Sequence, residues 1–423
     1  MKVSKDSLSH ILLALLILVT VNPWYSHFLI IEAVLVLFLV FTGALYIAKK
    51  RTFLSKKLLL VVSLFATLFF LQWIKYGILP IVTISGFFVK ILCAYFMVNI
   101  CKNFPLAFVK VVFVLSSISL VIWFLEVMTS LPLLDAFPKD YANEDSIMPR
   151  SLSPVYTAIT ENLDHVIKRN AGFTWEPGAF AGINIIALLF VGLSCGNFKG
   201  IKGKCYLIVF VASVLSSQST AGFVVLPIVL YIIFHANVSE NRLSMRSIGI
   251  SLLFISIIVL PVSIYFFNLP FVTEKIVLQL QAAAMSSDSL EANNSRFGSI
   301  LFDLTYIYES PFIGNGLNEI TRFRLHNIDA IALGHGNGLT DFLADFGLIA
   351  FGVVLWLIYG GITDLNPKDK ITPFLAMVVL LLILNGEPYF NHPFFWCIIF
   401  LSRNSKRLRA FADTPKRISR SFM

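Results

Sequence analysis

Charged residues are scarce in this sequence. Only 13% of its 423 residues are Asp, Glu, Lys or Arg, whereas 57% are hydrophobic and the mean hydropathy is +0.82. Soluble domains carry about 25% charged residues, so this composition excludes an ordinary soluble enzyme and indicates a membrane protein. The formal net charge of +9 does not point to nucleic acid, because the basic residues concentrate in a few short loops, notably 49–57, 199–204 and 402–409.

Cysteines and cofactor motifs are also scarce. The five cysteines fall within apolar runs or near their expected cytoplasmic ends, which excludes an extracellular disulfide framework. The sequence contains no HExxH or CxxC pair, no phosphate-binding glycine loop and no dinucleotide fingerprint. We therefore expect neither a metal nor another cofactor, and an enzyme of this kind would need a substrate that carries its own leaving group.

Long apolar runs, in contrast, are abundant. A helix needs about 20 predominantly apolar residues to cross the ~30 Å hydrocarbon core of a bilayer. Twelve runs are candidates: 8–23, 27–48, 58–75, 79–100, 105–128, 178–196, 204–217, 220–236, 247–268, 338–360, 371–386 and 392–403. The sequence thus predicts an all-α polytopic membrane protein with about twelve transmembrane helices.

The loops between these runs predict the orientation. Lys and Arg accumulate in loops that would all face the cytoplasm if both chain ends lie there. Two long segments, 129–177 and 269–337, would then face outward. They separate a five-helix segment (1–128), a central helical segment (178–268), and C-terminal helices with a basic tail (338–423). Loops of this length are usually functional or disordered, so we expect the functional site there.

Each long loop is predicted to contain a short amphipathic helix. In the first loop, residues 155–170 are compatible with a helix. In the second, apolar residues recur at helical spacing from Phe297 to Ile307, whereas Arg296 and Asp303 share another face. We expect this second helix to lie on the outer membrane surface and to stop near Pro311.

Four of the apolar runs that would begin at the outer face follow polar or glycine- and proline-containing strings. A helix N-terminus offers unpaired amides and a partial positive charge that favour an anion. The strings that lead into these runs are WEPGAF, SSQSTAG, GHGNG and EPYFNHP. The outer loops also carry arginines, whose guanidinium groups suit phosphate oxygens, and the candidates among them are Arg169, Arg296, Arg322 and Arg324. The expected ligand is a diphosphate headgroup held at the bilayer surface.

Other titratable residues accompany these arginines. His335 has the ordinary pKa of a general base, although a histidine in this place could simply cap a helix. Asp341 and Asp345 lie one turn apart and indicate either a polar cavity or a structural arginine partner. Glu176, just before Pro177, fits a helix-capping role first and a substrate contact second.

Lys90 lies near the middle of the fourth apolar run. Its side chain cannot easily reach the membrane surface from there, so it should face a partner or a cavity. Glu32, at the outer end of the second run, is the candidate partner.

Four strings carry a family resemblance: RNAGFTWEPGAFAG (169–182), SSQSTAG (216–222), NSRFGSILFDLTYIYESPFIGNG (294–316) and HGNGLTDFLADFGLIAFG (335–352). In order and placement they resemble the superfamily of O-antigen polymerases (Wzy-type) and O-antigen ligases. The likeness covers roughly residues 165–360. The first five runs agree with the family only in hydropathy.

The resemblance implies a GT-C-like fold and a metal-independent, inverting glycosyltransferase in the bacterial inner membrane, active at the periplasmic face. Its donor would be an undecaprenyl-diphosphate-linked oligosaccharide, and a chain-length-regulating membrane protein is a partner that the family allows. By motif, Arg169 and Arg296 would bind the diphosphate and His335 would activate the acceptor hydroxyl.

The family's His-Asn pair is interrupted here, because Gly336 separates His335 from Asn337. His326, which is followed directly by Asn327, is therefore an alternative base. The remaining residues expected to bind substrate are Arg322, Arg324, Glu176, Asn337 and Asp341.

Three functions are compatible with these features. A polymerase would transfer a growing lipid-linked glycan onto a lipid-linked repeat unit, whereas a ligase would transfer the finished glycan to lipid A-core with the same arginines and histidine. A transporter or flippase of an anionic lipid or solute would instead use intramembrane residues such as Lys90 and Glu32. The sequence shows no internal repeat that would favour transport.

Overall fold

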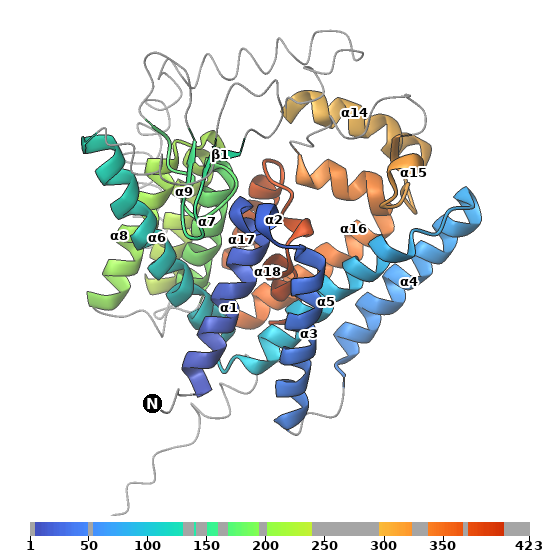
Figure 1. Ribbon diagram of the computed structural model, residues 1–423, viewed down its shortest axis with the longest axis horizontal. Coiled ribbons are helices and arrows are strands. Elements are labelled where there is room, and N and C mark those ends of the chain that lie inside the picture. The colour runs from blue at the N-terminus through green and yellow to red at the C-terminus, as the bar shows by residue number, and fades with distance from the viewer. Residues whose placement is uncertain are drawn as a thin grey trace, which may run out of the picture.

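The computed structural model describes residues 5–49, 54–129, 139–140, 150–159, 168–193, 201–238, 296–323, 337–366 and 371–401. Within these ranges the chain is helical apart from one small sheet (Figure 1). The N-terminal helices are α1 (Lys5–Val21), α2 (Pro23–Phe28), α3 (Ile31–Ala48), α4 (Lys56–Tyr76), α5 (Ile81–Ile100) and α6 (Phe104–Thr129).

The later elements follow the two long loops. They are α7 (Pro177–Leu193), α8 (Ile201–Ser217), α9 (Thr220–Val238), α14 (Arg296–Glu309), α15 (Glu319–Phe323), α16 (Gly338–Leu365), α17 (Ile371–Leu384), the 3-10 helix η4 (Tyr389–Asn391), α18 (Pro393–Trp396) and the 3-10 helix η5 (Cys397–Phe400).

Five helices of the described chain are long and apolar enough to cross a membrane: α3, α4, α5, α6 and α16. Shorter apolar helices, α1, α7, α8, α9 and α17, coincide with five further predicted runs. The run 247–268 lies outside the described residues. The run 392–403 is not a continuous spanning helix as expected, because its described part forms only the short α18 followed by η5.

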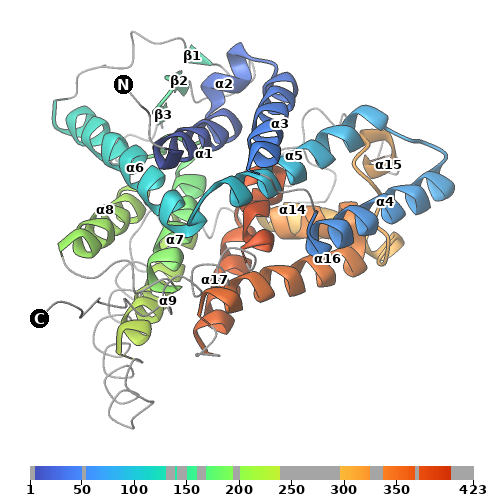
Figure 2. The same cartoon turned by 90° about the horizontal axis from the view of Figure 1, so that it is seen from below.

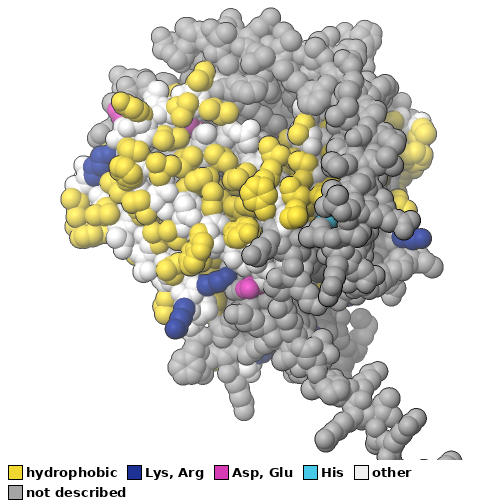
Figure 3. All heavy atoms as spheres, turned by 180° about the vertical axis from the view of Figure 1, so that it is seen from behind, with side chains coloured by type: hydrophobic (Ala, Val, Ile, Leu, Met, Phe, Trp, Pro, Cys, Tyr) yellow, Lys and Arg dark blue, Asp and Glu magenta, His cyan; other side chains and the backbone are white. Residues whose placement is uncertain are grey.

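A broad apolar surface accompanies these helices. In Figure 3, hydrophobic side chains gather in a wide band over the described part of this face, and the charged side chains lie toward its margins. Elsewhere on the surface, several exposed side chains of α3, α4 and α16 are also large and apolar, among them Leu37, Trp73 and Trp356. Contact of such an apolar surface with lipid is favourable, whereas its contact with water is unfavourable.

α7 is the buried centre of one half of the molecule. Every residue of α7 is buried, and the helix packs against α6, α8, α9 and α17 (Figures 1 and 2). In the other half, aromatic rings of α4, α5, α16 and α18 pack edge to face, for example Phe65 with Phe87, Phe346 and Trp396. The buried segment from α18 to η5 lies against α5, α1 and α16.

α16 is broken at Gly347. The sequence predicts one spanning helix over 338–360, but Gly347 has φ +74° and ψ 176°, a conformation that is almost restricted to glycine. The helix therefore consists of a short first part, which packs against α14, and a longer apolar second part. Asp345 belongs to the short first part, two residues before the break.

The loop after α14 satisfies the backbone groups that this break leaves open. Asn315 N donates to Ala344 O at 2.8 Å, Gly316 N donates to Asp345 O at 2.9 Å, and Leu348 N donates to Pro311 O at 2.7 Å. Buried amides and carbonyls need such partners. The string ESPFIGNG was expected only to end a helix. It also supplies the hydrogen-bond partners of the backbone groups at the bend in α16.

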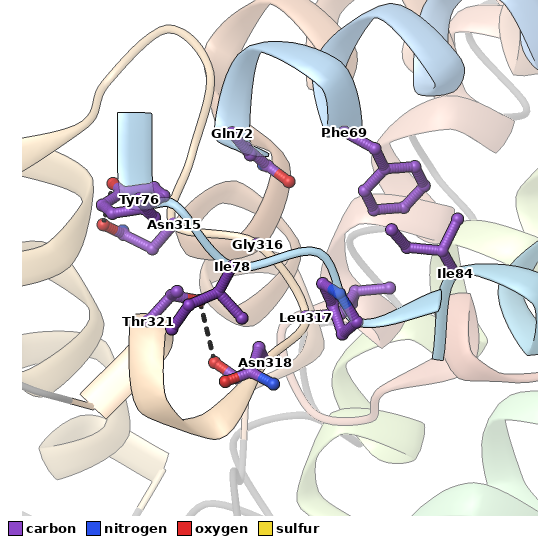
Figure 4. A pocket seen from close by; sticks show the side chains of 11 residues that line it. Phe69, Gln72, Tyr76, Ile78, Ile84, Asn315, Gly316, Leu317, Asn318 and Thr321 are labelled. Atoms are coloured by element: carbon purple, nitrogen blue, oxygen red, sulfur yellow. Dashed lines mark hydrogen bonds between the residues drawn. The ribbon is translucent and has the colours of Figure 1, made fainter. Parts of the chain in front are cut away.

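Side chains of α4 also form hydrogen bonds with the loop after α14 (Figure 4). Gln72 Nε2 donates to Ile313 O at 2.6 Å and to Asp345 O at 2.9 Å, and Tyr76 Oη donates to Asn315 Oδ1 at 2.9 Å. The space left between these side chains and Thr321 is about 10 Å³, which is room for roughly one water molecule. This region is therefore a packed contact between α4 and the loop after α14, and not a binding pocket.

We expect Gly347→Ala to destabilise the protein by about 1–3 kcal/mol, because a non-glycine residue is strained in this conformation and its Cβ would overlap the backbone of Phe312. The measurement is the Tm of the protein purified in detergent. Gly352→Ala on the same helix is the control, since a Cβ there meets nothing within 4 Å. Equal Tm values for the two variants would contradict the strained break.

The first long loop differs from expectation. Residues 155–170 were predicted to favour a helix, but Thr157–Ile159 form strand β3, which pairs with β2 (Arg150–Leu152), and β2 pairs with β1 (Lys139–Asp140). The helix prediction is therefore wrong for residues 157–159. Thr157 N also donates to Gly172 O at 2.7 Å, and this long-range contact is invisible to a local helical pattern.

Candidate functional site

Arg169 is fixed by the turn between α8 and α9. Its Nε donates to Ser217 O at 3.2 Å. The neighbouring Asn170 is fully buried, its backbone N donates to Ser216 O at 3.0 Å, and its Nδ2 donates to Ser216 Oγ at 3.0 Å. The strings RNAGF and SSQSTAG, 46 residues apart at Asn170 and Ser216, therefore form one structure.

The end of α6 holds the chain just before Arg169. Trp123 Nε1 donates to Lys168 O at 2.7 Å, and Lys168 Nζ pairs with Glu126 Oε1 at 3.2 Å. Tyr156 Oη donates to the other oxygen of Glu126 at 3.1 Å. Burial and the charge of Glu126 raise the pKa of Tyr156 above its ordinary value, so this phenol stays a neutral donor. Arg169 is thus anchored on both sides.

A tight turn leads from Asn170 into α7. Gly172 has φ +57°, its N donates to Asn170 Oδ1 at 2.9 Å, and the Phe180 ring occupies the space that a side chain at this position would need. Glu176 is the N-cap residue, because its carbonyl accepts the first helical hydrogen bond from Phe180 N at 3.1 Å. Pro177 opens the helix, as the sequence predicts.

The segment 385–392, which contains EPYFNHP, packs against the start of α7. Tyr389 Oη donates to Ala179 O at 2.9 Å, and its ring fills the space beside Gly182. The His392 imidazole stacks on the Trp175 indole with ring centroids 4.6 Å apart and planes 13° apart. Contact between these rings joins two strings that are more than 200 residues apart in the sequence.

The start of α16 joins the same segment. Asn337 is the N-cap: its Oδ1 accepts from Leu339 N at 3.1 Å and from Thr340 N at 3.0 Å, while its Nδ2 donates to Asn385 Oδ1 at 2.7 Å. A Cβ at Gly338 would overlap the backbone at Glu387. Asn337, predicted to bind substrate, therefore has a capping role in the structure.

These contacts connect the four strings that precede the predicted outer helix starts. We call residues 169–176, 216–222, 337–338 and 385–392 the helix-start junction. The helices that begin there are α7, α9, α16 and α18, and Arg169 is the cationic side chain among the junction's described residues. Helix N-termini and an arginine at one place favour a negatively charged group.

A second charged cluster lies at the other face of the α16 start. Arg322 of α15 contacts three carboxylates: Nη2 lies 2.5 Å from Asp303 Oδ1 and 3.7 Å from Asp341 Oδ1, and Nε lies 3.0 Å from Asp345 Oδ1. Thr340 Oγ1 donates to the second oxygen of Asp303 at 2.6 Å. The cluster ties α14 and α15 to the short first part of α16.

The charged groups of this cluster are largely removed from water. Asp303 is fully buried and Arg322 exposes only 3% of its surface, with the guanidinium 4.6 Å above the Tyr306 ring. Burial alone would lower the pKa of Arg322, but the neighbouring aspartates raise it above its ordinary value, so the arginine stays charged. Burial raises the pKa of Tyr306 to about 12, even though the charge of Arg322 acts in the opposite direction.

The prediction that Arg322 and Asp341 bind substrate is not supported by this geometry. The arginine is buried among aspartates of its own chain, which is the structural alternative that the Asp341 and Asp345 spacing left open. A guanidinium that already binds carboxylates in a buried place is poorly suited to exchange them for a diphosphate.

The remaining predicted residues have mixed outcomes. Arg296 is the first residue of α14, and the amphipathic helix predicted there is confirmed. Glu176 sits in the junction at the α7 N-cap. Arg324, His326 and His335 lie outside the described residues, although His335 comes two residues before the described N-cap Asn337.

Sequence reasoning missed several residues that build the site. Asp303 was noticed only as part of a polar helix face, and that face was the one available signal of its buried ion pair. Asn170, Tyr389 and His392 gave no separate signal, because their roles depend on partners far away in the chain.

Within the described ranges no group of three or more His, Cys, Asp or Glu side chains is arranged to hold a metal ion. Comparison of the chain with protein-family models gives no match, and comparison with curated proteins gives none either.

Proposed function

We propose that this chain is a membrane glycosyltransferase that polymerises a surface polysaccharide from undecaprenyl-diphosphate-linked oligosaccharides. The observation that carries the proposal is the helix-start junction, where anchored Arg169 lies near the starts of α7 and α9, and the segment 385–392 connects α7 to the start of α16. The resemblance of the same strings to the O-antigen polymerase and ligase superfamily supports it. The proposal includes about twelve transmembrane helices, a GT-C-like arrangement and a junction that faces the periplasm.

The proposed reaction is a single inverting displacement. The acceptor hydroxyl oxygen attacks the anomeric carbon of the donor glycan, a new glycosidic bond forms, and the bond between that carbon and the diphosphate oxygen breaks. The undecaprenyl diphosphate leaves with the bonding electron pair, and its growing charge is stabilised by Arg169, Arg296 and the helix N-termini. His335 takes the proton of the acceptor hydroxyl.

The same chemistry would serve a ligase that uses lipid A-core as the acceptor. The long first loop, 129–177, is the feature that favours the polymerase in this proposal. The polysaccharide of a deletion strain distinguishes the two. A lost polymerase leaves single repeat units on lipid A-core, whereas a lost ligase leaves long lipid-linked chains and an uncapped core.

We expect His335→Ala to lower chain extension by about 10² to 10⁴-fold, the contribution of a positioned general base, and to leave the amount of membrane-inserted protein unchanged. The measurement is the polysaccharide ladder of a deletion strain that carries the variant. His326→Ala is the matched control and should give a normal ladder. If His326→Ala abolishes extension and His335→Ala does not, the base assignment is reversed.

A further inference from the structure

A separate cavity of about 480 Å³ lies between α3, α5 and the segment 385–392. Its polar lining includes Thr20, Glu32, Lys90, Asn391 and His392, and the remainder is largely apolar, with Leu35 and Val89 as examples. This volume falls in the range of sites that bind small molecules. The prediction that Lys90 faces a cavity is therefore confirmed.

Two side chains of opposite charge, Glu32 and Lys90, line this cavity without forming an ion pair with each other. Glu32 is the second residue of α3 and Lys90 the tenth of α5. Within the described part of the chain, neither side chain has an ion-pair partner within 4 Å. A lysine at mid-helix in an apolar protein is costly unless it meets an anion, so the cavity favours an occupant that carries charge.

The rim of the cavity favours hydrocarbon. Val82 and Ile81 at the start of α5 line the cavity and expose 83% and 67% of their surfaces. Val36 of α3 is also exposed. These side chains are expected to lie in lipid, so a ligand that enters between them should have an apolar chain as well as a charged head.

We propose that this cavity binds a zwitterionic phospholipid of the surrounding bilayer, with an amine headgroup such as ethanolamine. Its phosphate lies toward Lys90 and His392, its ammonium group lies toward Glu32, and the start of an acyl chain lies between Val82 and Val36. In this arrangement the negative phosphate of the lipid faces the positive Lys90, and the positive ammonium group faces the negative Glu32.

The lipid site touches the helix-start junction at one residue. His392 lines the cavity and also stacks on Trp175 of the junction. A lipid bound beside His392 would support this stacked pair. The lipid-binding proposal does not depend on the proposed glycosyltransferase activity, since it rests on the cavity, its two charges and its rim.

The test is lipid retention by the full-length protein. The protein is placed in nanodiscs of equal parts phosphatidylethanolamine and phosphatidylglycerol, released into mild detergent and weighed by native mass spectrometry. We expect about one phosphatidylethanolamine per chain, retained at least about tenfold over phosphatidylglycerol. Lys90→Met should lose this retention, and Glu32→Gln should still retain lipid but lose the preference for the amine head.

Lys75→Met is the matched control, because Lys75 is exposed at the end of α4 and lies over the Tyr76 ring, outside the cavity. Val82→Trp is a second variant that narrows the entrance without changing charge, and it should also lose retention. Equal retention by the wild type and Lys90→Met, or a wild-type preference for phosphatidylglycerol, would overturn the proposal. If Lys90→Met does not fold, the result with Val82→Trp decides.

Discussion

Arg169→Ala is expected to lower glycan chain extension by about 10² to 10³-fold, the usual loss when one stabiliser of developing negative charge is removed. The structural reason is that the Arg169 Nε donates to Ser217 O, which orients the guanidinium plane at the starts of α7 and α9. The measurement is the length of the polysaccharide ladder in a deletion strain, normalised to the amount of protein in the membrane.

Arg169→Lys should restore little of this activity. A lysine ammonium keeps the charge but has no fixed fork of N–H groups, so it cannot hold Ser217 O and bind a phosphate with the same geometry. Lys75→Gln is the control. Lys75 is exposed at the end of α4 over the Tyr76 ring, away from the junction residues, and its loss should leave the ladder normal.

Two outcomes would contradict this account of Arg169. A wild-type ladder with Arg169→Ala would remove the residue from the site altogether. Full rescue by lysine would show that only charge matters and that the anchored guanidinium geometry does not.

Arg322→Met is expected to destabilise the protein by about 3–5 kcal/mol, the range found when one partner of a buried ion pair is removed. Without the guanidinium, buried Asp303 would keep only its hydrogen bond from Thr340 among the contacts described above. Asp341 and Asp345 would lose their common cation. The measurement is the Tm and the yield of folded protein in detergent.

A compensating change tests the physical reason. Arg322→Met combined with Asp303→Asn and Asp345→Asn should recover part of the lost Tm, because it also removes two negative charges that the arginine would no longer neutralise. Glu319→Gln is the control, since Glu319 lies exposed on the same short helix. If Arg322→Met keeps the wild-type Tm but loses activity, Arg322 binds substrate and its structural role is wrong.

Local patterns in the sequence predicted most helices but not how they bend or what they contact. The apolar runs at 27–48, 58–75 and 79–100 correspond to α3, α4 and α5, because hydrophobic length is a local property. The break at Gly347 was not predicted, since glycine is common in membrane helices and its effect here depends on the backbone of Phe312 and Asn315.

The candidate site, too, was only partly predictable from the sequence. The motif strings marked the start of α7 correctly, and the period of the apolar residues marked α14 from Arg296, whereas the role of Arg169 stays a prediction. The sequence grouped Arg322 with the other outer arginines, because residue type alone cannot distinguish an arginine that meets a ligand from one that meets three aspartates of its own chain.

The sequence by itself determined that this chain is apolar, that its described part is almost entirely helical, and that polar, glycine-containing strings precede several helices. Each of these properties follows from the composition and spacing of neighbouring residues. Tertiary structure alone decided that four distant strings meet in one junction, that Arg322 is neutralised by aspartates, and that Lys90 and Glu32 share a cavity. Those outcomes depend on which helices pack together, and long-range packing sets the partners of every buried polar group.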